Sequence, residues 1–165
     1  MDASKLLDDL SVRIYEPPLS DFRDDGRICD TTNPLSVVML LIDYETECSM
    51  NGINGFLGNS AGSRLSETIF AVRQIGCIDH ANTLEQIRET ASAAGMTYDA
   101  IQDDCVGLAE FTVTSFAKLH GDKWDDACDR IRELHDNVDW ESFWQATLEF
   151  VRNNVDSIAR QSTTQ

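Results

Sequence analysis

Long apolar runs are missing from this sequence of 165 residues, and their absence argues against a membrane-spanning helix. No apolar stretch approaches the roughly 20 residues that a transmembrane helix needs. The first residues, Met1-Asp2-Ala3-Ser4-Lys5, also lack the basic-then-apolar order of a signal peptide. The sequence therefore predicts a cytoplasmic protein with no membrane partner.

Cysteine pairs that could form a disulfide framework are also missing. The five cysteines are odd in number, scattered along the chain and never spaced as Cys-x-x-Cys. This pattern is typical of small, mostly buried thiols in a reducing compartment, so it agrees with a cytoplasmic location. We expect all of them to be free thiols: Cys29, Cys48, Cys77, Cys105 and Cys128.

Histidine is scarce, and its spacing argues against a metal site. The three histidines lie on separate predicted helices without a His-x-x-x-His pair, and they are His80, His120 and His135. We interpret them as surface or helix-terminal residues. The acidic stretch 21–32 fits a calcium loop only in part, because Arg23 falls at position three and Thr32 at position twelve, where a bidentate Glu is needed. The sequence therefore predicts no metal ion and no other cofactor.

Strand signals are weak throughout the sequence. No segment alternates apolar and polar residues between hairpin signals, although residues 111–114 are locally strand-like. Apolar residues recur at helical spacing instead. The expected helices span residues 4–16, 34–50, 63–75, 79–93, 98–105, 107–120, 122–137 and 139–160. With short loops, no repeat and no linker, the chain is predicted to be all-α, an irregular single-domain helical bundle of about eight helices.

The predicted domain has three parts. Residues 1–34 are expected to form an N-terminal helix, capped by Ser4 and stopped by Pro17-Pro18, and then an acidic loop that packs on the domain. Residues 35–160 make up the all-α domain itself. Residues 161–165 are expected to form a polar tail.

The segment from Pro34 to Gly62 organises the chain. Asn33 is a favoured N-cap, and Pro34 suits the first helical position because its missing N–H would have no partner within the helix. The helix that follows is the least polar in the sequence, which is typical of a helix at the centre of its domain. We expect it to end near Met50, where a run rich in Asn and Gly begins.

The Asn/Gly-rich run at residues 51–62 is predicted to be a structural loop, since Gly and Asn tolerate a left-handed backbone. Phe56 and Leu57 lie in its midst, so we expect the loop to fold back onto the core. The residues expected to shape the loop are Asn51, Gly52, Gly55, Phe56, Asn59 and Gly62.

A Gly-x-Ser-x-Gly string around Ser60 matches the nucleophile elbow of serine hydrolases. That motif needs a strand that delivers the serine to a strained turn, whereas a helix and a turn are predicted before Ser60. The simpler interpretation is that Asn59 or Ser60 caps the next helix. A small serine hydrolase that uses Ser60 is the alternative from a different functional class.

The same run carries a family resemblance. An apolar helix, a Gly-Ile-x-Gly-Phe-Leu-x-Asn-Ser-x-Gly run at 52–62 and an amphipathic helix that ends in Ile75-Gly76 together resemble the DNA-mimic protein family. Members of this family are acidic, mostly helical bacterial proteins. The resemblance covers roughly residues 38–95, and it departs from the family at Met50-Asn51-Gly52, where Asn-Gly-Gly is usual. It implies an all-α protein that competes with nucleic acid for a DNA-binding protein.

Acidic residues dominate the charge, with 29 Asp and Glu against 13 Lys and Arg, for a net charge of −16. Such a field repels nucleic acid and attracts basic proteins, so we expect no direct nucleic-acid binding. A simple gain in solubility is the alternative explanation of the charge. The tryptophans have acidic neighbours, so we expect them to anchor helices rather than to stack on bases: Trp124, Trp140 and Trp144.

One acidic pattern stands out near the C-terminus. Five carboxylates are spaced four, three, four and three residues apart, which places them on one helical face: Asp122, Asp126, Asp129, Glu133 and Asp136. The opposite face carries apolar residues that can turn inward. Such a line of anions resembles the charges of a phosphate strand. A solvated acidic face without a partner is the competing interpretation.

These observations favour a non-enzymatic protein that binds and blocks a basic protein surface, as a DNA mimic competing for a DNA-binding protein. An immunity protein that neutralises a bacterial toxin, such as a nuclease, is the second interpretation. The partner is expected to be basic in either case. The pattern of residues leaves the oligomeric state open.

Overall fold

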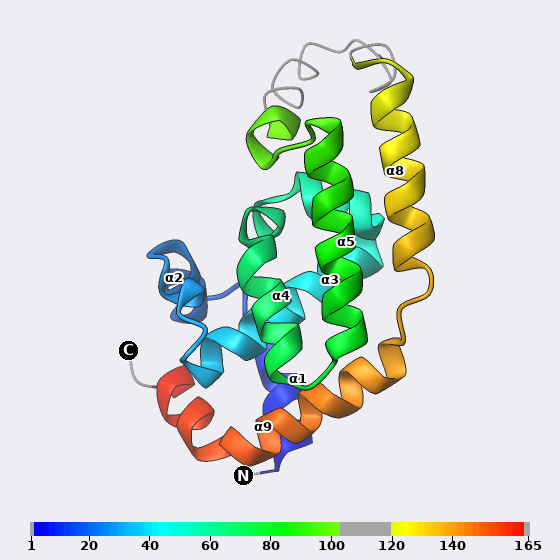
Figure 1. The fold of residues 1–165 in the computed structure, drawn as a ribbon. Helices are drawn as coiled ribbons and strands as arrows, with labels where there is room; N and C mark the ends of the chain where they lie inside the picture. Colours follow the sequence, from blue (N-terminus) through cyan, green and yellow to red (C-terminus); the bar gives the residue numbers. More distant parts are fainter. Residues whose placement is uncertain (1, 103–119, 164–165) are drawn as a thin grey trace.

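A computed structural model of the chain describes residues 2–102 and 120–163 (Figure 1). All regular structure in this part of the chain is helical, so the predicted all-α class is confirmed. No helix among these residues is both long and apolar enough to span a membrane. The helices are α1 (Ala3–Arg13), α2 (Leu19–Asp24), α3 (Pro34–Gly58), α4 (Leu65–Gln74), α5 (Ile78–Ala94), α8 (Asp122–His135) and α9 (Trp140–Thr163), with the 3₁₀ segments η1 (Arg27–Cys29) and η2 (Ser60–Arg64).

Helix α3 lies at the centre of the fold and contacts α4, α8, α9 and both 3₁₀ segments. Its start follows the prediction, because the Asn33 side chain accepts a hydrogen bond of 2.9 Å from the Leu35 amide and Pro34 occupies the first helical position. All residues from Leu35 to Tyr44 are buried. A helix surrounded in this way must be largely apolar, and its buried polar side chains, Ser36 and Asp43, are hydrogen-bonded to η1 and α2.

The predicted end of the central helix near Met50 lies close to a break in α3 at Gly52, but the stretch that follows is a second helical segment and not the predicted loop. Helix α3 bends at Gly52, where φ is 68° and ψ is 177°, and then continues to Gly58. Glycine takes this left-handed φ without the steric cost that a β-carbon would add, so the chain can turn and resume a helix immediately. Phe56 and Leu57 are buried in the resumed segment, which confirms that this stretch folds back onto the core.

The turn after α3 depends on Gly62. A β-carbon at this position would lie 2.3 Å from the carbonyl oxygen of Phe56 and 2.6 Å from that of Leu57. Only glycine therefore lets η2 pack against the end of α3. Asn59 caps η2, because its side-chain oxygen accepts a hydrogen bond of 2.7 Å from the Ser60 amide. Asn59 therefore caps η2, whereas helix α4, which Asn59 or Ser60 was expected to cap, begins at Leu65 without a side-chain cap.

The N-terminal region differs from its prediction in two respects. Helix α1 is capped by Asp2 rather than Ser4, since Oδ1 of Asp2 accepts a hydrogen bond of 3.1 Å from the Ser4 amide. The acidic stretch that follows holds α2 and η1, so it is not simply a loop. Arg23 fixes α2 to α3 through two hydrogen bonds to the buried carboxylate of Asp43, at 3.2 and 2.8 Å.

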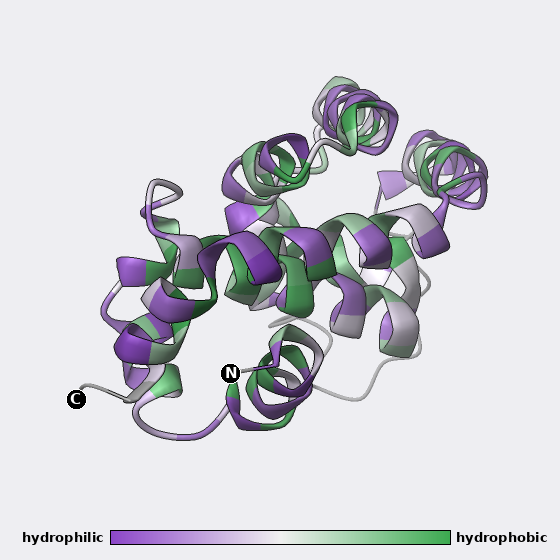
Figure 2. Ribbon diagram, turned by 90° about the horizontal axis from the view of Figure 1, so that it is seen from below, coloured by the Kyte–Doolittle hydropathy of each residue, from purple (hydrophilic) through white to green (hydrophobic). Residues whose placement is uncertain are grey.

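The remaining helices surround α3. Helices α4, α5 and α8 stand side by side, and α9 crosses beneath them to pack against α3 and α1 (Figure 1). Hydrophilic and hydrophobic residues share the same helices, as amphipathic packing requires (Figure 2). Helix α9 continues to Thr163, so the expected polar tail begins as helix. Residues 98–102 are helical. The predicted helix 107–120 lies almost entirely outside the described residues, and the strand-like segment 111–114 lies wholly outside them.

Candidate functional site: the acidic face of helix α8

Helix α8 is amphipathic, and its apolar side holds it firmly on the fold. Trp124, Ala127 and Ile131 are buried, as their spacing predicts. The indole Nε1 of Trp124 donates a hydrogen bond of 3.0 Å to the carbonyl oxygen of Ala94 at the end of α5. Helix α5 is a principal neighbour of α8 along its length. The tryptophan therefore anchors the start of α8, as expected from the sequence.

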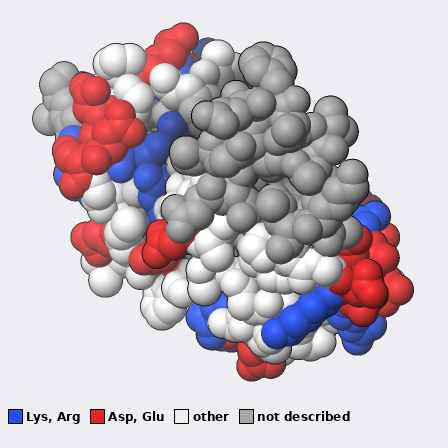
Figure 3. Space-filling view, turned by 90° about the horizontal axis from the view of Figure 1, so that it is seen from above, with Lys and Arg blue, Asp and Glu red and all other residues white. Residues whose placement is uncertain are grey.

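The opposite side of α8 carries carboxylates that are all exposed to solvent. We call this surface the acidic face, and it consists of Asp122, Asp126, Asp129, Glu133 and Asp136. It spans about 21 Å, since fourteen residue steps separate its ends and a helix rises 1.5 Å per residue. In the view from above, acidic side chains gather at the edge of the molecule where α8 runs, with basic side chains beside them (Figure 3).

Two of the five carboxylates pair with arginines of the same helix. Glu133 lies 3.2 Å from Arg130, and Asp129 pairs with Arg132. All four of these side chains are at least 60% exposed, so each pair contributes little to stability. The other three carboxylates make no ion pair with the described residues, and they remain available to a basic partner.

Helix stability explains only part of this charge pattern. Asp122 lies in the first turn of α8, where a negative charge interacts favourably with the helix dipole. Asp136 lies at the opposite end, where the dipole disfavours a carboxylate. The carboxylates between them are spaced at intervals at which like charges repel. Stability of the helix therefore does not account for a carboxylate at every one of these positions.

The end of α8 is held by a hydrogen-bond chain that the sequence analysis missed. The hydroxyl of Tyr44 on α3 lies 2.8 Å from Nε2 of His135 and 2.8 Å from Nε2 of His80 on α5. His80 is only 8% exposed, so it is not a surface residue, although it does lie at a helix end, in the first turn of α5. His135 is half-buried at the end of α8. The spacing in the sequence could have predicted that His80 is buried. It lies four residues before Leu84 and seven before Ile87, which places it on the same inward face of the helix.

Burial keeps the three side chains of this hydrogen-bond chain uncharged. It lowers the pKa of His80 to about 4 and also lowers the pKa of His135. Burial likewise raises the pKa of Tyr44 well above its ordinary value. The hydroxyl of Tyr44 can donate only one proton, so it donates to one imidazole and accepts from the other. The ring of Trp140 packs against all three groups, and that of Phe143 packs against Tyr44 and His80.

The other candidate chemistries gain no support from the geometry. His120 stacks on Trp124 with ring centroids 3.6 Å apart, away from the other two histidines. No group of three or more potential metal ligands forms among the described residues. Ser60 is exposed, and its hydroxyl lies 3.4 Å from the side-chain oxygen of Asn59. A helix rather than a strand precedes Ser60, so the nucleophile elbow is not formed.

The described cysteines form no disulfide, but their burial differs from the prediction. Cys29 is exposed, while Cys48, Cys77 and Cys128 are half-buried. Burial raises the pKa of the latter three thiols, which disfavours their reactive thiolate form. Cys105 lies outside the described residues.

A family model described as DMP19-like protein matches residues 30–154, which include α3 and the whole acidic face. The chain belongs to the DMP19-like family. This is a family of DNA-mimic proteins, so the resemblance inferred from residues 38–95 is confirmed over a longer part of the chain. DMP19-like proteins are generally non-enzymatic, and a DNA mimic implies a DNA-binding protein as partner. Comparisons with curated proteins and with solved structures gave no match.

Proposed function

We propose that this protein is a non-enzymatic DNA mimic that uses the acidic face of α8 to occupy the DNA-binding surface of a basic protein. The observation that carries the proposal is the line of exposed carboxylates along one helix, in a chain of a DNA-mimic family. The net charge of −16 supplies a long-range field that draws basic proteins towards this surface. The same field repels nucleic acid itself.

The spacing of the carboxylates suits a surface that accepts a phosphate strand. A single strand of B-DNA carries about six phosphates over the 21 Å or so that the acidic face spans. The acidic face presents five carboxylates over the same length. Lys and Arg side chains that contact successive phosphates can therefore contact successive carboxylates. Arginine is especially suited to this exchange, because its planar guanidinium binds phosphate and carboxylate with the same fork of donors.

The fold presents this charge on a rigid support. Trp124 fixes one end of α8, and the hydrogen bond between Tyr44 and His135 fixes the other. Between them, the side-chain amide of Asn54 donates a hydrogen bond of 3.3 Å to the carbonyl oxygen of Cys128. A helix held at three points loses little conformational freedom when a partner binds, which favours affinity.

A basic toxin neutralised by an immunity protein would also be attracted by this charge. Membership in a DNA-mimic family favours a DNA-binding protein instead. The two partners differ in one measurable respect. DNA competes directly for the surface that a mimic covers, whereas it need not compete when a toxin is bound elsewhere.

The test is affinity capture from a lysate of the native host. The immobilised chain should retain DNA-binding proteins that are released by an excess of duplex DNA and identified by mass spectrometry. The variant Asp126→Lys, Asp129→Lys, Glu133→Lys changes the net charge from −16 to −10. It should lose this retention, chiefly through a slower association measured by surface plasmon resonance. Folding should be nearly intact, because the three side chains face water and only the two exposed ion pairs are lost.

A second variant controls for net charge. Asp8→Lys, Glu89→Lys and Asp156→Lys also give a net charge of −10, from exposed positions on α1, α5 and α9. This variant should retain the partner nearly as well as the parent. If both variants bind like the parent, the acidic face is not the site, and the exposed carboxylates of Asp24 and Asp25 become the next candidates. Release by salt but not by DNA would point to a toxin.

A further inference from the structure

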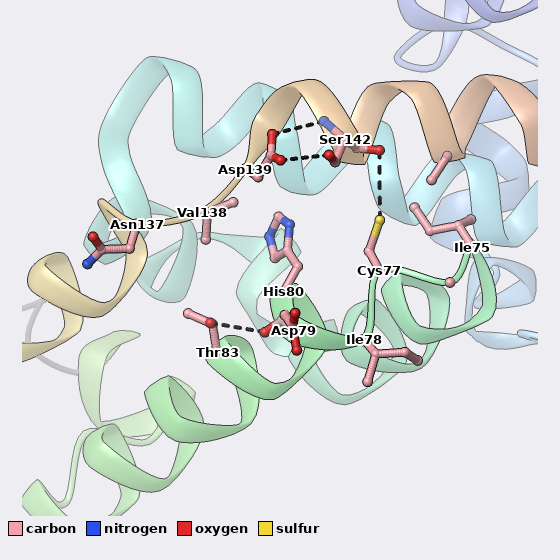
Figure 4. A pocket seen from close by; sticks show the side chains of 12 residues that line it. Ile75, Cys77, Ile78, Asp79, His80, Thr83, Asn137, Val138, Asp139 and Ser142 are labelled. Atoms are coloured by element: carbon pink, nitrogen blue, oxygen red, sulfur yellow. Dashed lines mark hydrogen bonds between the residues drawn. The ribbon is translucent and has the colours of Figure 1, made fainter.

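A pocket of about 520 Å³ opens between the start of α5 and the connection from α8 to α9. Its wall is partly apolar, from Ile75, Ile78 and Val138. Its polar groups include the carboxylates of Asp79 and Asp139, and no Lys or Arg is among the described residues that line it. The imidazole of His80 projects from α5 into the space between these groups (Figure 4).

The imidazole of His80 has one nitrogen that the fold does not satisfy. Nε2 is bonded to the Tyr44 hydroxyl, but Nδ1 is buried and has no hydrogen-bond partner among the described residues. The residue as a whole is 92% buried, since only 8% of it is exposed. An unsatisfied buried polar atom destabilises the fold, so a ligand that satisfies it gains part of the lost free energy.

We propose that this pocket binds a small aliphatic amine or diamine, whose ammonium group donates a hydrogen bond to Nδ1 of His80 between the carboxylates of Asp79 and Asp139. The charge of the lining selects a cation over an anion, because two carboxylates face the pocket without a basic side chain to balance them. The apolar wall suits the methylene chain. The inference does not depend on the DNA-mimic proposal.

The hydrogen-bond chain behind His80 is compatible with this role. An ammonium group can donate to Nδ1 only if the imidazole is neutral and carries its proton on Nε2. Burial keeps His80 neutral at pH 7 by lowering its pKa to about 4. Nε2–H then donates to the oxygen of Tyr44, and the Tyr44 hydroxyl donates to Nε2 of His135.

The carboxylate of Asp139 is ionised and positioned before any ligand binds. It accepts hydrogen bonds from the amide of Ser142 at 3.0 Å and from its hydroxyl at 2.6 Å. These bonds lower the pKa of Asp139 below its ordinary value. A carboxylate has about four acceptor sites, so Asp139 can still accept from an ammonium group. Asp79 is exposed in the first turn of α5 and carries the second charge.

The probes are putrescine, n-butylamine, butane-1,4-diol and succinate, each added to the full chain at 150 mM salt. With ¹⁵N-labelled histidine, putrescine and n-butylamine should move the Nδ1 resonance of His80, whereas the neutral diol and the dianion should not. Calorimetry should then give a saturable dissociation constant for putrescine. A response to the diol equal to that to putrescine, or no response to either amine, would overturn the proposal.

Matched variants separate this site from diffuse attraction by the acidic surface. His80→Gln keeps a side-chain amide near the position of Nε2, but it removes Nδ1, and it should weaken putrescine binding by about tenfold or more. Asp79→Asn removes an exposed carboxylate without touching the core, so it tests the site even if His80→Gln folds poorly. Glu89→Gln on the outer side of α5 should leave the affinity unchanged. Equal weakening by all three variants would contradict a defined site.

Discussion

His80 has a different pKa in the folded and unfolded chain, and this difference links stability to pH. Burial lowers the folded-state pKa to about 4 from an ordinary value of 6.5. Between these values the unfolded chain binds more protons, so stability is full above pH 6.5 and falls as the pH is lowered towards 4. The loss from His80 is on the order of 3 kcal/mol, at 1.36 kcal/mol per pKa unit. His135 shifts in the same direction.

We therefore expect urea denaturation midpoints to fall between pH 6.5 and pH 4.5. The groups that face His80 are Tyr44, His135, Trp140, Phe143 and Asp139. The carboxylate of Asp139 acts against the shift, but burial outweighs it. In His80→Gln the denaturation midpoint should fall less steeply over the same pH range, because one buried ionisable group has been removed. An equally steep fall in this variant would show that other groups cause the loss.

Burial was predicted correctly from the sequence for apolar residues at helical spacing. It was not predicted for polar residues whose environment is set by contacts between helices. Trp124 and Ile131 follow the helical period and lie inside, as expected. His80 follows the same period as Leu84, but it was interpreted as a surface or helix-terminal residue rather than as a buried one. The contacts among Tyr44, His80 and His135 join three helices, and no local pattern of residues encodes such a meeting.

At the scale of helices, α2 depends on a buried ion pair. The side chains of Arg23 and Asp43 are 13% and 8% exposed, and they form two hydrogen bonds. Removing one partner leaves a buried charge uncompensated, so Arg23→Ala should destabilise the protein by about 3–5 kcal/mol. Arg13→Ala breaks the more exposed pair with Asp9, and it should cost no more than about 1 kcal/mol.

Urea denaturation of both variants measures these two effects. A double variant, Arg23→Met with Asp43→Leu, removes both buried charges and should recover most of the loss caused by Arg23→Ala. If Arg23→Ala costs no more than Arg13→Ala, then the buried pair does not hold α2 in place.

The helix boundaries show that local sequence patterns determine only part of the fold. The start of α3 is encoded by two adjacent residues, Asn33 and Pro34, and it was predicted correctly. The bend at Gly52 was predicted as the end of the helix, because glycine is compatible both with a helix end and with a bend after which a helix resumes. The burial of Phe56 favours the second arrangement. Helix α2 was missed because its six residues are held by contact with η1 and by the bonds from Arg23 to Asp43 on α3, rather than by their own propensity.

At the scale of the whole molecule, the acidic residues repel one another. Among exposed charges, this repulsion acts over about 30 Å at 10 mM salt, but over only about 3 Å at 1 M. Acidic residues outnumber basic ones by 16, so repulsion should outweigh the attraction within the exposed ion pairs. Added salt should therefore stabilise the isolated protein, even though salt weakens individual surface ion pairs.

The thermal midpoint should rise when NaCl is increased from 20 to 500 mM, and each kcal/mol gained corresponds to roughly 2–4 °C for a chain of this size. The two triple variants with a net charge of −10 should respond less, since less repulsion remains to be screened. Over the same salt range, a complex held by the acidic face should dissociate. These opposite responses exclude unfolding as the cause of dissociation. A midpoint that falls with salt would mean that attractive pairs, rather than the excess of carboxylates, control the stability of the molecule.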